Sequence, residues 1–193
     1  MKLFRLSQRI TDDELVQGCQ GRDAKSQRAL YDRFSPKMMS LCFRYINQAE
    51  IAEEVMSNGF IQCFQHIDQF NFNGSFEGWL RKIVVRACLA YLRSKKNLEF
   101  KTEPIEHNVE KFYYTPELYL DADDLMQLIA DLPNGYKTVF NLYAIEGYKH
   151  AEIAEMLQIS ENTSKTQLMR ARDLLQSRVK ALETQLNELT HES

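Results

Sequence analysis

The chain has little glycine and proline, with seven and four of them among 193 residues. No segment shows a convincing alternation of apolar and polar residues, which argues against half-buried β-strands. Apolar residues recur instead at helical spacing almost throughout. We therefore predict an all-α protein with helices near Thr11–Gly21, Ala24–Ile46, Ala49–His66, Glu77–Lys95, Asp121–Asp131, Gly135–Glu146, Lys149–Leu157 and Glu161–Leu189.

Cysteine and histidine are also few, and they are scattered. The four cysteines form no Cys-x-x-Cys pair, so no zinc site, redox motif or other cofactor is predicted, and we expect reduced thiols buried as small hydrophobes. They are Cys19, Cys42, Cys63 and Cys88. The four histidines lie near no nucleophile motif, which makes an enzyme the least favoured class. They are His66, His107, His150 and His191.

Long apolar runs are absent. The amino-terminal segment MKLFRLSQRITDDEL holds none of the length that a signal sequence needs, and no later segment approaches the length of a membrane span. We expect a soluble, cytoplasmic protein that does not insert into a membrane.

The formal net charge of −3 argues against a protein that coats nucleic acid nonspecifically, but the charge is segregated. Residues Arg81–Lys101 hold seven Lys and Arg and one acid, whereas Glu103–Asp131 hold eight acids and one base. This division is typical of a protein that binds nucleic acid with one part and a basic surface or channel with another. Ordinary solvation of an exposed linker explains it equally well.

The helical pattern stops between Asn97 and Leu120, a stretch with two prolines and no sustained amphipathic period. We interpret residues 97–120 as a flexible linker. Two small helical domains are then predicted, over residues 1–96 and 121–193.

The segment Glu146–Leu175 has the outline of a helix-turn-helix. Ser160 is a suitable N-cap for the second helix, while Gln158 stands where a glycine would ease the turn. Ser164 falls on the side expected to be buried, and its hydroxyl is expected to bond a carbonyl one turn back. The predicted buried side chains are Ile153, Ala154, Leu157, Leu168, Ala171 and Leu175.

The second helix carries a separate face of basic, hydroxyl and apolar side chains, a mixture suited to base edges and phosphates of duplex DNA. Its members are Lys165, Thr166, Met169, Arg170 and Arg172. A solvated basic surface on an ordinary helical protein remains the alternative.

In the first domain, the stretch HIDQFNFNGSFEGW places aromatic side chains beside small polar ones in a loop. Such a loop is suited to stacking on unpaired bases, and basic residues of the following helix are suited to the backbone phosphates. The candidate single-strand site comprises Phe70, Asn71, Phe72, Asn73, Ser75, Trp79, Lys82 and Arg86, with Phe76 and Arg93 nearby. The alternative is that Phe72, Phe76 and Trp79 fill a helix corner, while the polar residues Asn71, Asn73 and Ser75 form turns and caps.

The helix before this loop has a mostly polar face that is either a docking surface or simply solvated. It comprises Glu53, Glu54, Ser57, Asn58 and Ile61, with Gln62 and an exposed Met56 also expected there.

In order and separation, these segments resemble the extracytoplasmic-function sigma factors, small two-domain initiation subunits of bacterial RNA polymerase. The resemblance runs from about Asp13 to Gln176. It rests on AEEVMSNGFIQCFQHIDQFN, GSFEGWLRKIVVRACLAYLRSKK, LPNGYKTVFNLYAIEGYKHAEIAEML and ISENTSKTQLMRARDLL, which look like that family's second and fourth conserved regions.

The resemblance implies a sigma factor that binds core RNA polymerase, selects promoters and helps to melt their −10 region. The Glu53–Ile61 face would dock on the polymerase clamp, and the Phe70–Phe76 loop would capture a flipped −10 base. The helix-turn-helix would read the −35 element as duplex, with Lys165, Thr166 and Met169 near bases and Arg170 and Arg172 near phosphates. The acidic segment Glu103–Asp124 would run through a basic polymerase channel, and an anti-sigma factor is a further implied partner.

Some positions depart from the family pattern. Arg86 and Ala90 stand where many members have Asn and Asp, and Ser57 and Asn58 replace a commoner Gln-Glu pair. Ser164 and Gln167 resemble a variant found in one branch of the family. Two other functions stay open at this point: an ordinary helix-turn-helix regulator, and a sigma-like antagonist that binds polymerase without starting transcription.

Overall fold

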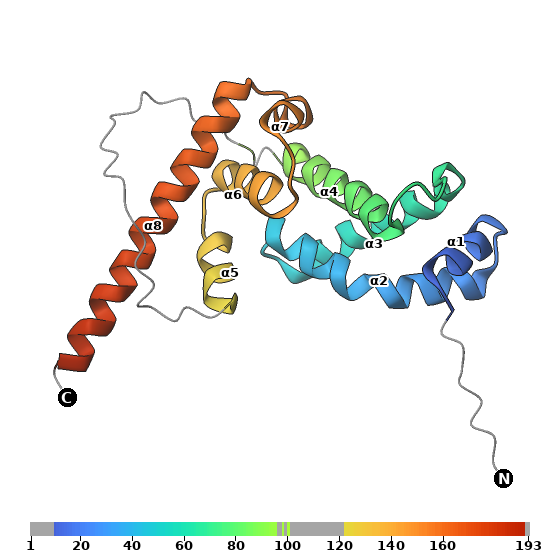
Figure 1. Ribbon diagram of the computed structural model, residues 1–193, viewed down its shortest axis with the longest axis horizontal. Helices are drawn as coiled ribbons and strands as arrows, with labels where there is room; N and C mark the ends of the chain where they lie inside the picture. Colours follow the sequence, from blue (N-terminus) through green and yellow to red (C-terminus); the bar gives the residue numbers. More distant parts are fainter. Residues whose placement is uncertain (1–9, 96–97, 99, 101–121, 192–193) are drawn as a thin grey trace, which may run out of the picture. The chain divides into compact units, whose positions relative to one another are not determined.

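The computed structural model describes residues 10–95, 98, 100 and 122–191. These residues form eight α-helices, one 3-10 turn and one π-helical turn, and contain no β-strand, which confirms the all-α prediction. Figure 1 shows the helices, which divide into two compact units, Met1–Tyr91 and Leu92–Ser193. The proposed linker, residues 97–120, lies outside the described residues except at 98 and 100.

The first unit contains α1 (Asp12–Gln20), α2 (Ala24–Tyr45), α3 (Ala49–Gln65), the 3-10 turn η1 (Ile67–Gln69) and most of α4 (Phe76–Ser94). Thr11 caps α1 through a capping box, in which Thr11 Oγ1 accepts the Glu14 N–H at 3.2 Å and Glu14 Oε2 accepts the Thr11 N–H at 2.7 Å. Asp23 caps α2 by accepting the Ser26 N–H at 2.8 Å. The turn between α1 and α2 is therefore closely defined.

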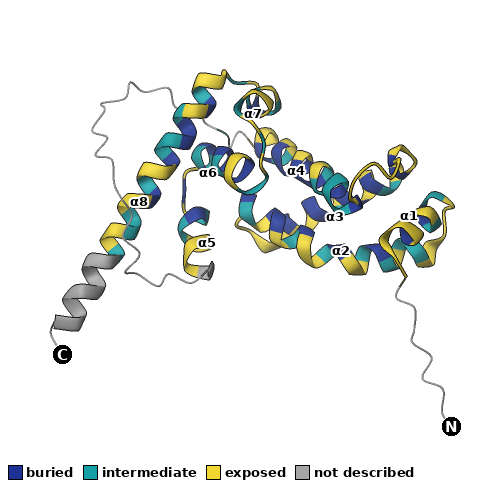
Figure 2. Ribbon diagram, viewed as in Figure 1, coloured by how far each residue is buried: buried dark blue, intermediate teal, exposed yellow. Residues whose placement is uncertain are grey.

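Small residues let these helices approach closely. A Cβ added at Gly18 of α1 would lie 2.1 Å from Ser26 Oγ of α2, and one at Gly59 of α3 would lie 3.0 Å from Val84 Cγ2 of α4. Figure 2 shows buried segments alternating with exposed ones along these helices. All four cysteines are buried and free, as the sequence predicts, with Cys42 Sγ of α2 at 3.7 Å from Cys88 Sγ of α4.

The second unit contains α5 (Ala122–Ala130), α6 (Asn134–Phe140), the π-helical turn η2 (Asn141–Ile145), α7 (His150–Leu157) and α8 (Glu161–His191). The expected continuous helix Gly135–Glu146 is wrong in its last turn. There the Glu146 N–H bonds the Asn141 carbonyl at 2.9 Å, five residues back, and Gly147 with φ +79° then ends the element. The helical period cannot distinguish this wider turn from an α-helical one.

Two cations bond carbonyls at the carboxyl end of α5, one from α6 and one from the long helix α8. Lys137 Nζ donates to the Ala130 carbonyl at 3.1 Å, and Arg178 donates to the carbonyls of Leu128 and Asp131 at 3.2 and 3.3 Å. Cations favour the carbonyl end of a helix. The adjacent core contains Ile129, Leu132, Ala171 and Leu175.

Candidate nucleic-acid interfaces

The helix-turn-helix of the second unit is formed by α7, a tight turn and the first turns of α8. Gln158 lies in the left-handed region with φ +57°, the conformation that a glycine adopts at lower cost. Ser160 Oγ accepts the Thr163 N–H at 2.9 Å, which confirms Ser160 as the N-cap of α8. Of the predicted buried residues, Ala154 is half-buried and the others are buried.

Ser164 joins the two helices instead of bonding its own helix, so the expected backbone bond is wrong. Its side chain is fully buried, and its Oγ lies 2.9 Å from Nδ1 of His150, the first residue of α7. With the ring proton on Nε2, Nδ1 accepts from the Ser164 hydroxyl. The sequence pattern does not predict this contact because it joins residues fourteen positions apart on two helices.

His150 is surrounded by aromatic and cationic groups. Its ring stacks on Tyr143 of η2, with centroids 4.6 Å apart and planes inclined by 22°. Burial and the cations Lys165 and Arg172 lower the pKa of His150, while Glu161 acts in the opposite direction. The neutral ring is therefore the favoured state.

The predicted duplex-binding face lies partly exposed on α8. Lys165 and Arg172 are exposed, while Thr166, Met169 and Arg170 are half-buried. The Arg172 guanidinium carbon lies 5.8 Å from the centre of the Tyr143 ring, and Arg170 Nη1 donates to Tyr136 Oη at 3.4 Å. These contacts hold two cations near one stretch of the helix, where a phosphate backbone can be bound.

The aromatic loop of the first unit has buried aromatic residues at its two ends and an exposed tip. Phe70 and Phe76 are 3% and 2% exposed, and their rings contact edge-on with centroids 5.5 Å apart. Trp79 packs on both and is half-buried. Phe72 is 37% exposed. The alternative of a helix corner therefore describes Phe76 but not the exposed Phe72. Phe70 is also buried, and direct stacking of a base on Phe70 does not fit its burial.

The tip of this loop has an unusual backbone. Phe72 has φ +62°, a region that aromatic residues rarely adopt, and Gly74 has φ +101°. Asn71 Oδ1 accepts the Asn73 N–H at 3.2 Å, and Ser75 Oγ accepts the Gly78 N–H at 3.1 Å. Asn71 and Ser75 thus form the turn and cap that sequence reasoning considered as their alternative role. Within the described part of the chain, the Asn73 side-chain amide has no hydrogen-bond partner.

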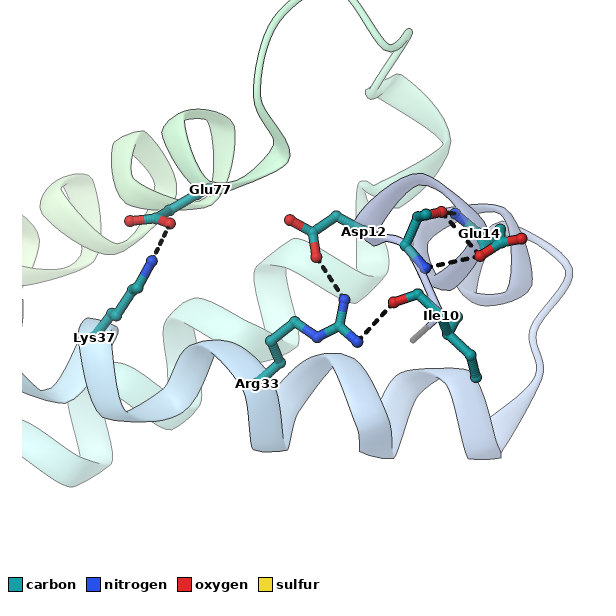
Figure 3. A network of polar contacts seen from close by, with 7 residues as sticks. Ile10, Asp12, Glu14, Arg33, Lys37 and Glu77 are labelled. Carbon is teal, nitrogen blue, oxygen red and sulfur yellow. Dashed lines mark hydrogen bonds and ion pairs between the residues drawn. The ribbon is translucent and has the colours of Figure 1, made fainter. Parts of the chain in front are cut away.

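Side chains of α1, α2 and the turn between them fix both ends of this loop. Gln20 Nε2 donates to the carbonyls of Ile67 and Phe70, both at 3.1 Å, and Arg22 pairs with Asp68 at 2.7 Å. At the other end, Lys37 Nζ lies 2.5 Å from Glu77 Oε2 in the first turn of α4. Figure 3 shows this pair, with Arg33 binding Asp12 and the Ile10 carbonyl nearby. Sequence reasoning missed Gln20, Arg22 and Lys37 because their partners lie forty or more residues away.

The other two predicted surfaces are exposed for the most part. Lys82 and Arg86 are exposed on α4. On α3, Glu53, Glu54, Asn58 and Ile61 are exposed and Ser57 is half-buried, with Ile61 at 53%. The expected exposure of Met56 is wrong, because it is 4% exposed and belongs to the core.

No described helix has both the length and the apolar character to cross a membrane. The described residues also bring together no cluster of His, Cys, Asp and Glu able to hold a metal ion.

Two family models match this chain. The model for sigma-70 region 2 matches residues 30–98, and the model for sigma-70, region 4 matches residues 122–175. The chain is 25% identical over 189 residues to the ECF RNA polymerase sigma-E factor of Haemophilus influenzae. The match covers 92% of this chain and 100% of the relative. It is 26% identical to the protein of the same name from Escherichia coli strain K12, over 92% and 98% of the two chains.

Two solved structures share the fold. One is CnrH in complex with the cytosolic domain of CnrY, with a TM-score of 0.50 and 18% identity over 88% of this chain and 97% of that chain. The other is the sigma factor RpoE of Bartonella quintana in complex with the anti-sigma factor NepR, with a TM-score of 0.51 and 16% identity over 81% and 98%.

Proposed function

Because the chain belongs to the extracytoplasmic-function group of the sigma-70 family, we propose that it binds core RNA polymerase, directs it to specific promoters and helps to melt their −10 region. One observation carries this proposal. A single chain presents an exposed aromatic ring on a strained loop and, after it, a helix-turn-helix with a basic face. The first suits unpaired bases and the second suits a duplex.

The duplex −35 element is the proposed ligand of the first turns of α8. Lys165, Thr166 and Met169 contact base edges, and Arg170 and Arg172 contact phosphates. The exposure of Lys165 and Arg172 supports these roles. Arg170 donates to Tyr136 Oη at 3.4 Å, and a guanidinium is the side-chain group best matched to phosphate oxygens.

The single-stranded −10 element is the proposed ligand of the aromatic loop. Phe72 stacks on an unpaired base and the Asn73 amide reads its edge, while the half-buried Trp79 borders this site. Lys82 and Arg86 hold the backbone phosphates. The role of Phe70, Asn71 and Ser75 in this site is to support the loop. Phe70 is buried, and the side chains of Asn71 and Ser75 accept hydrogen bonds that shape the loop backbone.

Core polymerase is the proposed partner of the α3 face. Exposed carboxylates beside an exposed Ile61 suit a basic protein surface with an apolar contact at its centre. The face comprises Glu53, Glu54, Ser57, Asn58 and Ile61. An anti-sigma factor is a further proposed partner, since a relative of similar fold was solved with one. The acidic segment Glu103–Asp124, proposed to occupy a basic polymerase channel, lies almost entirely outside the described residues.

Transcription of fragmented genomic DNA by core polymerase, with and without this chain, tests the proposal through the 5′ ends of the RNA. We expect new starts that share two upstream elements. Co-elution with core polymerase but no new starts would indicate an antagonist, for which Arg86 and Ala90 are the first residues to exchange. Duplex binding without any polymerase binding would indicate an ordinary regulator.

A further inference from the structure

The aromatic loop, residues Phe70–Phe76, is fixed from outside by a side chain of another helix. We infer that Gln20 is a positioning residue that holds this loop in the conformation that captures a −10 base. The inference rests on the proposed function of the loop, and it assigns a role to a residue that does not touch the nucleic acid.

Gln20 is the last residue of α1, and its amide group holds the entrance to the loop. Its Nε2 donates two hydrogen bonds, to the carbonyls of Ile67 and Phe70, each at 3.1 Å and partly buried. These two carbonyls belong to the first residue of η1 and to the residue that follows this turn. Within the turn, the Phe70 N–H donates a backbone hydrogen bond to the Ile67 carbonyl at 3.1 Å. One amide group therefore fixes the turn from which the chain enters the loop.

Two ion pairs also hold the loop, but they constrain it less than the Gln20 hydrogen bonds because their side chains are more exposed to water. Arg22 and Asp68 have side chains 61% and 56% exposed, and Lys37 and Glu77 have side chains 60% and 30% exposed. Exposed pairs of this kind contribute little because water and salt screen them. The partly buried bonds of Gln20 consequently carry most of the constraint.

The loop needs such a constraint because Phe72 adopts a backbone conformation that is unfavourable for an aromatic residue, with φ +62°. Conformations of this kind persist only where the surroundings enforce them. Asn71 and Ser75 fix the interior of the loop, whereas Gln20 fixes its entrance through Phe70, whose ring contacts that of Phe72 with centroids 5.2 Å apart. Loss of the Gln20 donors would let Phe72 relax to a negative φ and withdraw its exposed ring.

Gln20→Glu tests this directly, because it keeps the size of the side chain and replaces a donor by an acceptor that repels both carbonyls. Gln17→Glu is the matched control, since it places the same charge on the exposed side of the same helix. Amide hydrogen exchange of the full chain is the first readout. We expect exchange at Phe70–Ser75 to accelerate by at least about fivefold in Gln20→Glu, with α3 and α4 unchanged. Equal exchange in the two variants would overturn the inference.

The second readout is the rate of promoter opening by holoenzyme at a promoter mapped with the wild-type chain. Gln20→Glu should slow opening by about fivefold or more and leave binding to core polymerase unchanged. Phe72→Ala is run in parallel to test the loop itself. If Phe72→Ala slows opening while Gln20→Glu does not, the positioning role is overturned. If Phe72→Ala has no effect, the proposed function of the loop fails, and the inference fails with it.

Discussion

Phe70 and Phe72 lie two residues apart and have opposite surroundings. Phe70 is 3% exposed and packs among three aromatic rings, whereas Phe72 is 37% exposed and has φ +62°. The sequence predicts an aromatic loop but does not distinguish the buried residues from the exposed one, because the period-based pattern ends where the helix ends. Only the fold assigns one ring to the core and another to the surface.

Substitution of these two residues should therefore separate stability from function. Phe70→Ala removes a buried ring and should lower the free energy of unfolding by about 3–5 kcal/mol. Phe72→Gly should change it by less than about 1 kcal/mol, because relief of the left-handed backbone offsets the lost contact with Phe70. Promoter opening should nevertheless slow in Phe72→Gly. Urea unfolding followed by circular dichroism measures the first quantity, and a loss of several kcal/mol in Phe72→Gly would show that Phe72 is structural.

The buried thiols should be unreactive in the folded protein. Burial raises the pKa of Cys19 to about 11 and that of Cys63 to about 12. At pH 8 their thiolate populations then fall by roughly a hundredfold or more below those of ordinary thiols. A thiol-specific reagent should label these two cysteines slowly until denaturant is added, and rapid labelling of the native protein would contradict the buried arrangement.

The same thiols predict a fall of stability at alkaline pH. The unfolded chain releases thiol protons near pH 9.0, whereas the folded chain retains them up to the raised values. The free energy of unfolding should therefore decrease as pH rises through that window.

At the scale of elements, a partly buried hydrogen bond between His150 and Ser164 joins the first turn of α7 to α8. Helical spacing predicts almost every helix within two residues of its observed ends, because each buries a regular apolar stripe. It does not predict the π-helical turn η2 or this bond, because both depend on contacts between elements. The same limitation explains Met56, whose burial depends on which neighbours pack on α3.

The burial of His150 beside the cations Lys165 and Arg172 predicts a pH dependence of the second unit. The folded pKa of His150 is lowered from 6.5, so between the lowered value and 6.5 the unfolded chain binds more protons than the folded one. Stability should thus be full above pH 6.5 and decrease as pH falls through this window. Thermal unfolding at a series of pH values measures it. The decrease should be smaller in His150→Gln, and an unchanged profile in that variant would assign the titration to another group.

At the scale of the whole molecule, the two proposed reading sites lie in separate compact units of one chain. The sequence predicts both sites because each depends on a local segment: a loop rich in aromatics and a helix-turn-helix. It does not predict the groups that hold them in place, such as Gln20, whose partners lie 47 and 50 residues further along the chain. Fold class and site location are thus local properties here, while the conformation of each site is set by distant contacts.

The measurement that tests the central claim most directly is the mapping of RNA 5′ ends on fragmented genomic DNA with three holoenzymes. They contain the wild-type chain, Phe72→Gly with Asn73→Ala, and Lys165→Ala with Met169→Ala. The helix variant should weaken the sequence preference at the −35 element only, by roughly 1–3 kcal/mol per lost base contact. The loop variant should weaken the sequence preference at the −10 element only. Both should still bind core polymerase. Loss of both elements in either variant, or no shared elements with the wild-type chain, would contradict the division of labour.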